Sequence, residues 1–207
     1  KHAFIKVGIP FTAGTNPTGG SGKIMPGFFD SVGYTLHGST FLTFDALENG
    51  LLRANRNDAL PPTSPLLSLA LADKDVDRRI HFALNCGASS CPPIKKFTAE
   101  AIKEELGIVA ASYCESDDNV YIDGQAMTLK LNTIFKWYRV DFGESDYEVA
   151  GSLLECLREG EKKAGLRRML EGVTPDDNFI TYFPYDWTSD SVDPPTPFVP
   201  APTAATA

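Results

Sequence analysis

The chain has no long apolar run and no excess of positive charge. Nowhere in its 207 residues does an apolar run approach the roughly 20 residues of a membrane-spanning helix, so we expect no membrane-spanning segment. The 27 acidic side chains outnumber the 19 lysines and arginines, and the net charge is -8. Because binding to phosphates needs clustered basic side chains, we also expect no nucleic-acid partner.

Cysteine is scarce as well. The four cysteines, Cys86, Cys91, Cys114 and Cys156, are too few for a disulfide framework, and a chain of this length can bury a core without one. Cys114 and Cys156 fall on helical patterns, and we expect them in the core. No targeting segment is visible, although the chain begins at Lys1. The sequence does not identify the compartment of the protein. An intracellular location is favoured, either the cytoplasm or an organelle after removal of a targeting segment.

The composition is that of one globular domain with irregular ends. Apolar residues make up 43% of the chain and charged residues 22%, which is typical of a chain that buries a single core. We expect this domain to span residues 1–187. Residues 188–207 consist mostly of Asp, Ser, Pro, Thr and Ala, which bury too little apolar surface to fold alone. They are predicted to form an extended low-complexity tail.

Hydrophobic periodicity predicts a mixture of helices and strands. We expect hairpins at residues 34–44, with His37 at the turn, and at 120–129, where Asp123-Gly124 is typical of a two-residue turn. The expected helices are 45–55, opened by a capping box of Asp45 and Glu48, then 98–113, 131–140, 146–159 and 161–171. Strands are expected at 80–84 and 179–187. This order predicts an α+β fold, with a mostly antiparallel sheet of about five to six strands and packed helices.

Most of the reactive side chains gather in residues 79–94. Ile80, Phe82 and Leu84 alternate with polar or small residues, which predicts a strand with His81 and Asn85 on one face. On a continued strand Cys86 lies on the opposite face. A loop rich in Gly, Ser and Pro follows and contains Cys91, which can turn back toward His81.

This segment suggests a thiol nucleophile. Cys91 or Cys86 is the candidate nucleophile, His81 the base, and Asn85 or Glu48 the group that orients the base. Cys91 is the better of the two because Cys86 is expected on the face opposite His81. The alternative is that His81 is a half-buried histidine with its hydrogen bonds satisfied, Cys86 a small core residue, and residues 89–93 a rigid turn.

Other chemistries fit the pattern less well. A metal site of His81, Cys86 and Cys91 has a spacing that matches no standard zinc module, so we expect no metal and no cofactor. A C-x-x-C redox motif is excluded because four residues separate the cysteines. A serine hydrolase at Ser89 or Ser90 lacks the G-x-S-x-G elbow.

Several segments together resemble one family: residues 41–53, 79–94, 134–138 with Asp141-Phe142, and 185–187. They are similar to domain-of-unknown-function family 547, and the resemblance spans roughly residues 1–187. Members usually carry an upstream helix ending in a Tyr-Asn pair, which this sequence lacks, so we expect the domain to be N-terminally incomplete. The resemblance implies no particular activity.

Two functions remain open. In the first, the domain is an interaction or structural subunit of a larger protein assembly, with its C-terminal tail lying on a protein partner. The extended loops, the tail and the acidic surface suggest this role. In the second, it is a cysteine-dependent hydrolase or acyl transferase that uses His81, Cys86 and Cys91.

Overall fold

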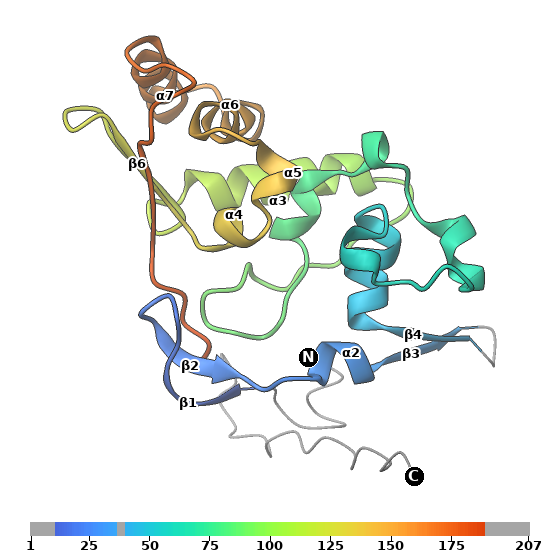
Figure 1. Ribbon diagram of the computed structural model, residues 1–207. Coiled ribbons are helices and arrows are strands. Elements are labelled where there is room, and N and C mark those ends of the chain that lie inside the picture. Colours follow the sequence, from blue (N-terminus) through green and yellow to red (C-terminus); the bar gives the residue numbers. More distant parts are fainter. Residues whose placement is uncertain (1–10, 37–39, 189–207) are drawn as a thin grey trace. The chain divides into compact units, whose positions relative to one another are not determined.

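The computed structural model describes residues 11–36 and 40–188 of the chain (Figure 1). The described residues form two compact units. The first comprises residues 11–15, 22–36, 40–77 and 187–188, and the second residues 16–21 and 78–186. The single domain expected over residues 1–187 stays a prediction. His37 and most of the predicted tail lie outside the described residues.

The first unit is built from short strands and short helical segments. Its elements are β1 (Phe11–Thr15), β2 (Ser21–Ile24), α2 (Phe28–Ser31), β3 (Gly33–Leu36), β4 (Thr40–Thr43), η1 (Ala46–Leu52), η2 (Arg56–Asp58), η3 (Pro65–Leu69) and η4 (Asp73–Asp75). Strand β1 pairs with β2, and β3 pairs with β4 in an antiparallel hairpin from Gly33↔Thr43 to Leu36↔Thr40. The hairpin predicted at residues 34–44 is therefore confirmed.

A small apolar cluster holds the first unit together. Leu42, Ala46, Leu60 and Leu66 are buried against one another. The helix predicted at residues 45–55 is confirmed as the π-helical segment η1, but Asp45 does not cap it. The Thr43 hydroxyl accepts the amide of Ala46 instead, at 3.0 Å.

The second unit contains the longer helices. Its elements are η5 (Arg78–Phe82), α3 (Ile102–Glu115), β5 (Val120–Asp123), β6 (Thr128–Leu131), α4 (Ile134–Trp137), α5 (Arg139–Phe142), α6 (Asp146–Cys156), α7 (Glu161–Glu171) and β7 (Ile180–Tyr182). The four predicted helices of this region are confirmed, with the one expected at 131–140 divided into α4 and α5. No helix among the described residues is long and apolar enough to span a membrane.

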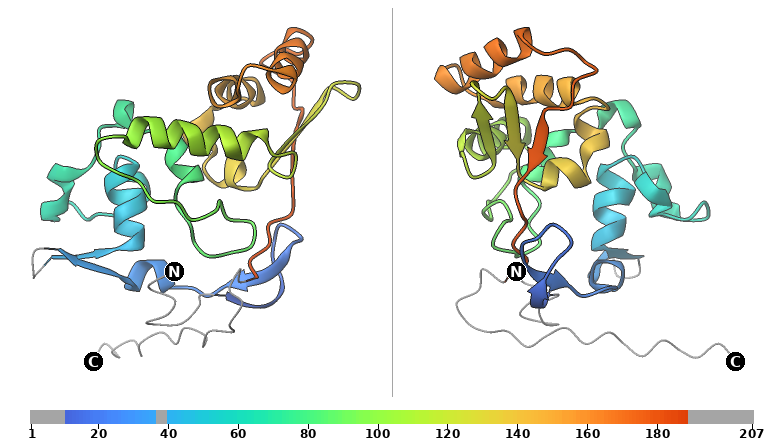
Figure 2. Two further views of the ribbon diagram at one scale, coloured as in Figure 1. Left: turned by 180° about the vertical axis from the view of Figure 1, so that it is seen from behind. Right: turned by 60° about the vertical axis from the view of Figure 1, so that its left-hand side comes forward.

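Three strands form the sheet of the second unit. β5 and β6 are antiparallel, and β7 lies parallel to β6 at the edge, as the right-hand view of Figure 2 shows. The Asp146 carboxylate fixes the start of β7 by accepting the amides of Phe179 and Ile180 at 2.9 and 2.8 Å. Pro184, which cannot donate to a ladder, lies beyond the end of β7.

The α+β class agrees with the sequence, whereas the predicted size of the sheet does not. The described strands form sheets of two, two and three strands, and no sheet of five or six is among them. The two-residue turn predicted at Asp123-Gly124 is also wrong. The loop between β5 and β6 is four residues long, and the Asp123 carboxylate closes it by accepting the amides of Gln125 and Ala126.

The strand predicted at residues 80–84 is wrong. Residues 78–82 form the 3₁₀ helix η5, in which the consecutive residues His81 and Phe82 are both buried. Phe82 packs against Tyr113 and Phe135, with ring centroids 4.8 and 5.5 Å apart. In a strand with one buried face, one of two consecutive side chains is exposed. The burial of both His81 and Phe82 therefore favours the helical turn. The predicted opposition of His81 and Cys86 across a strand therefore does not apply.

Candidate thiol site

The loop that follows η5 is closed by its first side chain. The side-chain amide of Asn85 donates to the carbonyl of Pro92, and its oxygen accepts the amide of Gly87 at 2.8 Å. Gly87 has φ of 85°, a conformation that glycine adopts without strain. The amide of Cys91 donates to the carbonyl of Ala88 at 3.0 Å and tightens the loop further. Asn85 thus fixes the two ends of the segment that carries both cysteines.

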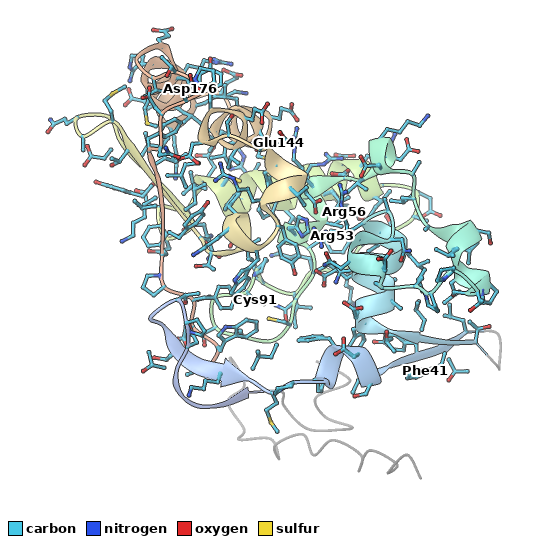
Figure 3. All side chains as sticks on the ribbon, in the orientation of Figure 1. Phe41, Arg53, Arg56, Cys91, Glu144 and Asp176 are labelled. Carbon is cyan, nitrogen blue, oxygen red and sulfur yellow. The ribbon has the colours of Figure 1, made fainter. Side chains whose placement is uncertain are left out.

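Closure of the loop brings the two cysteine sulfurs into contact. The Sγ atoms of Cys86 and Cys91 are 2.7 Å apart, and both thiols are free and half-buried. The amide of Cys86 also donates to Sγ of Cys91, at 3.2 Å. Figure 3 shows Cys91 on this loop. The sequence predicted Cys86 on the face opposite His81 and Cys91 in a loop that turns back toward His81, whereas the closed loop brings the two sulfurs together.

Tyr185 is the third member of this group, which we call the thiol site (Cys86, Cys91 and Tyr185). Its hydroxyl lies 3.3 Å from Sγ of Cys91 and 3.8 Å from Sγ of Cys86. The residue follows β7 and is buried, with its ring 4.6 Å from that of Trp137. The Tyr185 hydroxyl therefore meets the two sulfurs while the ring packs on Trp137.

The backbone of Tyr185 is held at several points. Its amide donates to the Thr18 hydroxyl at 2.8 Å, and its carbonyl accepts the side-chain amide of Asn16 at 2.6 Å. Next to it, the amide of Asp186 donates to the hydroxyl of Ser90 at 2.8 Å, and the amide of Ser90 donates to the carbonyl of Asp186 at 3.2 Å. These bonds fix the segment after β7 against the cysteine loop.

The two thiols differ in acidity. The hydrogen bond from Cys86 lowers the pKa of Cys91 to about 6, with smaller contributions from the Tyr185 hydroxyl and the amide of Cys86, while burial acts in the opposite direction. The same hydrogen bond, together with burial, raises the pKa of Cys86 well above its ordinary value. The opposite directions of the two shifts favour Cys91 as the thiolate and Cys86 as the donor of this coupled pair.

Tyr185 remains a donor at neutral pH. Burial, and then the negative charges of Cys86 and Cys91, raise the pKa of Tyr185. Its hydroxyl therefore keeps its proton when Cys91 is a thiolate. A neutral donor held against a thiolate stabilises the charged form of the sulfur.

His81 lies in the core of the second unit. Its Nε2 is 2.7 Å from the Oδ2 of Asp141 on α5, and both side chains are 0% exposed. The ring stacks on Tyr138 with centroids 3.9 Å apart. Asp141 is the partner of His81 that the sequence pattern did not predict, although Asp141-Phe142 is one of the segments that resemble the family.

The remaining predicted site residues are placed as follows. Asn85 clamps the cysteine loop, as described above. Glu48 lies on η1 in the first unit, so its role as an orienting group stays a prediction. Arg53, at the end of η1, donates to the side-chain oxygen of Asn49.

Cys114 and Cys156 lie near the ends of α3 and α6, and both are buried, which confirms their predicted place in the core. The neighbouring Cys156 thiol and burial raise the pKa of Cys114, whereas Cys114 lowers the pKa of Cys156. Over residues 11–36 and 40–188, no three or more His, Cys, Asp or Glu side chains form a group that could hold a metal ion.

Comparison with known proteins gives one match. The family model described as a protein of unknown function, DUF547, matches residues 1–114, a span that includes both cysteines of the thiol site but not Tyr185. No curated protein matches the chain. No solved structure matches it either.

Proposed function

Because the chain belongs to the family of proteins of unknown function DUF547, which supplies no reaction, we propose from the site geometry that it is a thiol-dependent enzyme whose nucleophile is Cys91. The observation that carries this proposal is the set of donors around one sulfur. The Cys86 thiol, the Cys86 amide and the Tyr185 hydroxyl lie 2.7, 3.2 and 3.3 Å from Sγ of Cys91.

Such an environment favours the reactive form of cysteine. The thiolate, not the thiol, is the nucleophile, and a free cysteine is mostly protonated at neutral pH. With a pKa lowered to about 6, Cys91 favours the thiolate at pH 7. The raised pKa of Cys86 keeps that residue protonated under the same conditions. Cys91 is therefore the sulfur that attacks, in agreement with the preference drawn from the sequence.

Acyl transfer is the reaction class that the sequence suggested, as a hydrolase or an acyl transferase. In that reaction His81 is the base, and Asp141 at 2.7 Å orients it. A histidine bonded to a carboxylate is the usual partner of a cysteine nucleophile. The observation that supports this class is the His81–Asp141 pair, which lies in the same unit as the thiol site.

Alkylation kinetics test the proposed nucleophile. Wild type is treated with iodoacetamide at pH 7 and digested, and the rate of modification of each cysteine is measured by mass spectrometry. Cys91 should react faster than free glutathione at the same pH, and Cys91→Ser should lose this fast phase. Cys114→Ser is the matched control because its thiol is buried, and it should keep the fast phase. A Cys91 that reacts no faster than glutathione contradicts the proposal.

The role in a larger assembly is a separate proposal. It rests on the composition of residues 188–207, of which 189–207 lie outside the described residues. NMR relaxation on the isolated chain tests it. Flexible residues 189–207 that become rigid only when a protein partner is added would support this role, whereas a tail that is already rigid in the isolated chain would remove its main support.

A further inference from the structure

We propose that the substrate of Cys91 is a small-molecule disulfide, and that Cys86 is the thiol that resolves the intermediate. This inference rests on the proposed function, since it requires Cys91 to be the nucleophile. The observation behind it is the contact of the two sulfurs, at 2.7 Å in a loop whose ends are clamped by Asn85.

The distance between the sulfurs is close to that of a bond. A disulfide bond is about 2.05 Å long, so the two Sγ atoms need to approach by only about 0.7 Å to form one. The loop is already closed by the bonds of Asn85 and by the bond from the Cys91 amide to Ala88. Little conformational entropy remains to be lost, so attack by Cys86 on a group held at Cys91 has a high effective concentration.

The same contact favours a disulfide over the acyl substrate considered above. A thioester at Cys91 would lie within reach of the Cys86 sulfur, and attack by Cys86 would only move the acyl group to the neighbouring sulfur. Hydrolysis would gain nothing from that transfer. A disulfide at Cys91 is different, because attack by Cys86 releases the held group and completes the reaction.

The reaction balances in two steps. The thiolate of Cys91 attacks one sulfur of the substrate disulfide, forms a mixed disulfide, and releases the other half as a thiolate that takes a proton from water. Cys86 then gives up its proton to water and attacks Sγ of Cys91. A Cys86–Cys91 disulfide forms, and the second half leaves as a thiolate that is protonated in turn.

In total, two electrons pass from the cysteine pair to the substrate, which becomes two thiols. A small-molecule thiol is the reductant that returns the pair to its starting state, through the reverse exchange. Each cycle therefore converts one substrate disulfide and two thiols of the reductant into two substrate thiols and one disulfide of the reductant.

Tyr185 has a place in both steps. Its hydroxyl lies 3.3 Å from Sγ of Cys91 and 3.8 Å from Sγ of Cys86, so it can donate to either sulfur while that sulfur carries negative charge. Cys86 and Cys91 are half-buried residues, and Pro92, next to Cys91 in the chain, and Tyr185 are buried. A small disulfide reaches such a sulfur more readily than a disulfide within a folded protein.

A stoichiometric assay with oxidised glutathione tests the inference. The fully reduced chain is mixed with oxidised glutathione without oxygen, and the released glutathione and the mass of the protein are measured. Wild type should release two glutathione molecules per chain and lose two hydrogens, with no adduct. Cys86→Ser should release one and keep a glutathione adduct on Cys91. Cys91→Ser should release no glutathione and carry no adduct. Cys114→Ser should behave as wild type.

The outcomes separate the two proposals. Insulin serves as a second substrate whose disulfides lie within a protein. Fast alkylation of Cys91 without any reaction with oxidised glutathione or with insulin would leave the proposed nucleophile in place and overturn the disulfide substrate. Slow alkylation would overturn both. Reduction of insulin without reduction of oxidised glutathione would overturn the assignment to a small molecule. If Cys86→Ser does not fold, Cys86→Ala gives the same test, with folding checked by circular dichroism.

Discussion

The hydroxyl of Tyr185 lies 3.3 Å from the sulfur of Cys91, although 94 residues separate the two along the chain. The contact depends on the bonds that Thr18 and Asn16 make with the Tyr185 backbone and on those between Ser90 and Asp186. This contact places a neutral hydrogen-bond donor against the proposed nucleophile. Through it, the segment after β7 contributes to the lowered pKa of Cys91.

Replacing Tyr185 by Phe should raise the pKa of Cys91. A hydrogen bond to a charged group contributes about 1.5–3 kcal/mol, and one pKa unit corresponds to about 1.4 kcal/mol, so the increase should be about one to two units. The measurement is the rate of iodoacetamide modification of Cys91 against pH. Tyr121→Phe is the control, since Tyr121 is exposed and should leave the profile unchanged. An unchanged profile in Tyr185→Phe would show that its hydroxyl does not stabilise the thiolate.

The modification rate of wild-type Cys91 should depend on pH with a midpoint near 6. Because the pKa is lowered, the thiolate is present above about pH 6 and is lost as the pH falls through that value. The rate should therefore rise through pH 6 and be nearly level by pH 7, with a second rise at alkaline pH when Cys86 titrates. Cys86→Ala removes the largest cause of the lowered pKa and should shift the midpoint toward the ordinary value of about 8.5. A midpoint near 8.5 in wild type would contradict the geometry.

Asp141→Asn should destabilise the protein. It replaces a carboxylate that is hydrogen-bonded to His81 where both side chains are 0% exposed, and disturbing a buried hydrogen bond of this kind costs about 1–3 kcal/mol. Urea unfolding at pH 7 measures the change. The matched control is Glu155→Gln, which breaks the largely exposed pair with Arg78 and should cost at most about 1 kcal/mol. Equal effects of the two substitutions would mean that the His81–Asp141 pair adds no more to stability than a surface pair.

Gly20→Ala should disturb Tyr185 and, through it, Cys91. A Cβ at Gly20 would lie 1.8 Å from the carbonyl oxygen of Tyr185, so the backbone of one segment must move. Such overpacking costs about 1–3 kcal/mol, and the pKa of Cys91 should rise as in Tyr185→Phe. Gly124→Ala is the control because a Cβ there meets nothing within 4 Å. Thermal unfolding and the alkylation profile are the two measurements, and a stable Gly20→Ala variant with the wild-type profile would refute the expectation.

Local patterns predicted much of the fold correctly. The helices that became η1, α3, α6 and α7 and the hairpins β3–β4 and β5–β6 follow from hydrophobic spacing and turn residues that act over a few positions. The prediction of a strand at 80–84 was wrong because alternation of apolar residues cannot distinguish a half-buried strand from a helical turn that is buried on both sides. Phe82 enters an aromatic cluster and His81 meets Asp141, and neither contact is visible in the local sequence.

For the candidate site, too, local sequence patterns predicted one part and the tertiary structure decided the other. The sequence by itself determined that the reactive residues gather in residues 79–94, and it named Cys91 as the sulfur to test. Only the tertiary structure decided that the Cys86 and Cys91 sulfurs touch, that Tyr185 lies against them, and that Asp141 binds His81. The reason is physical. Periodicity and turn preference act between near neighbours, whereas a hydrogen bond across 60 or 94 residues exists only after the chain has folded and buried both partners.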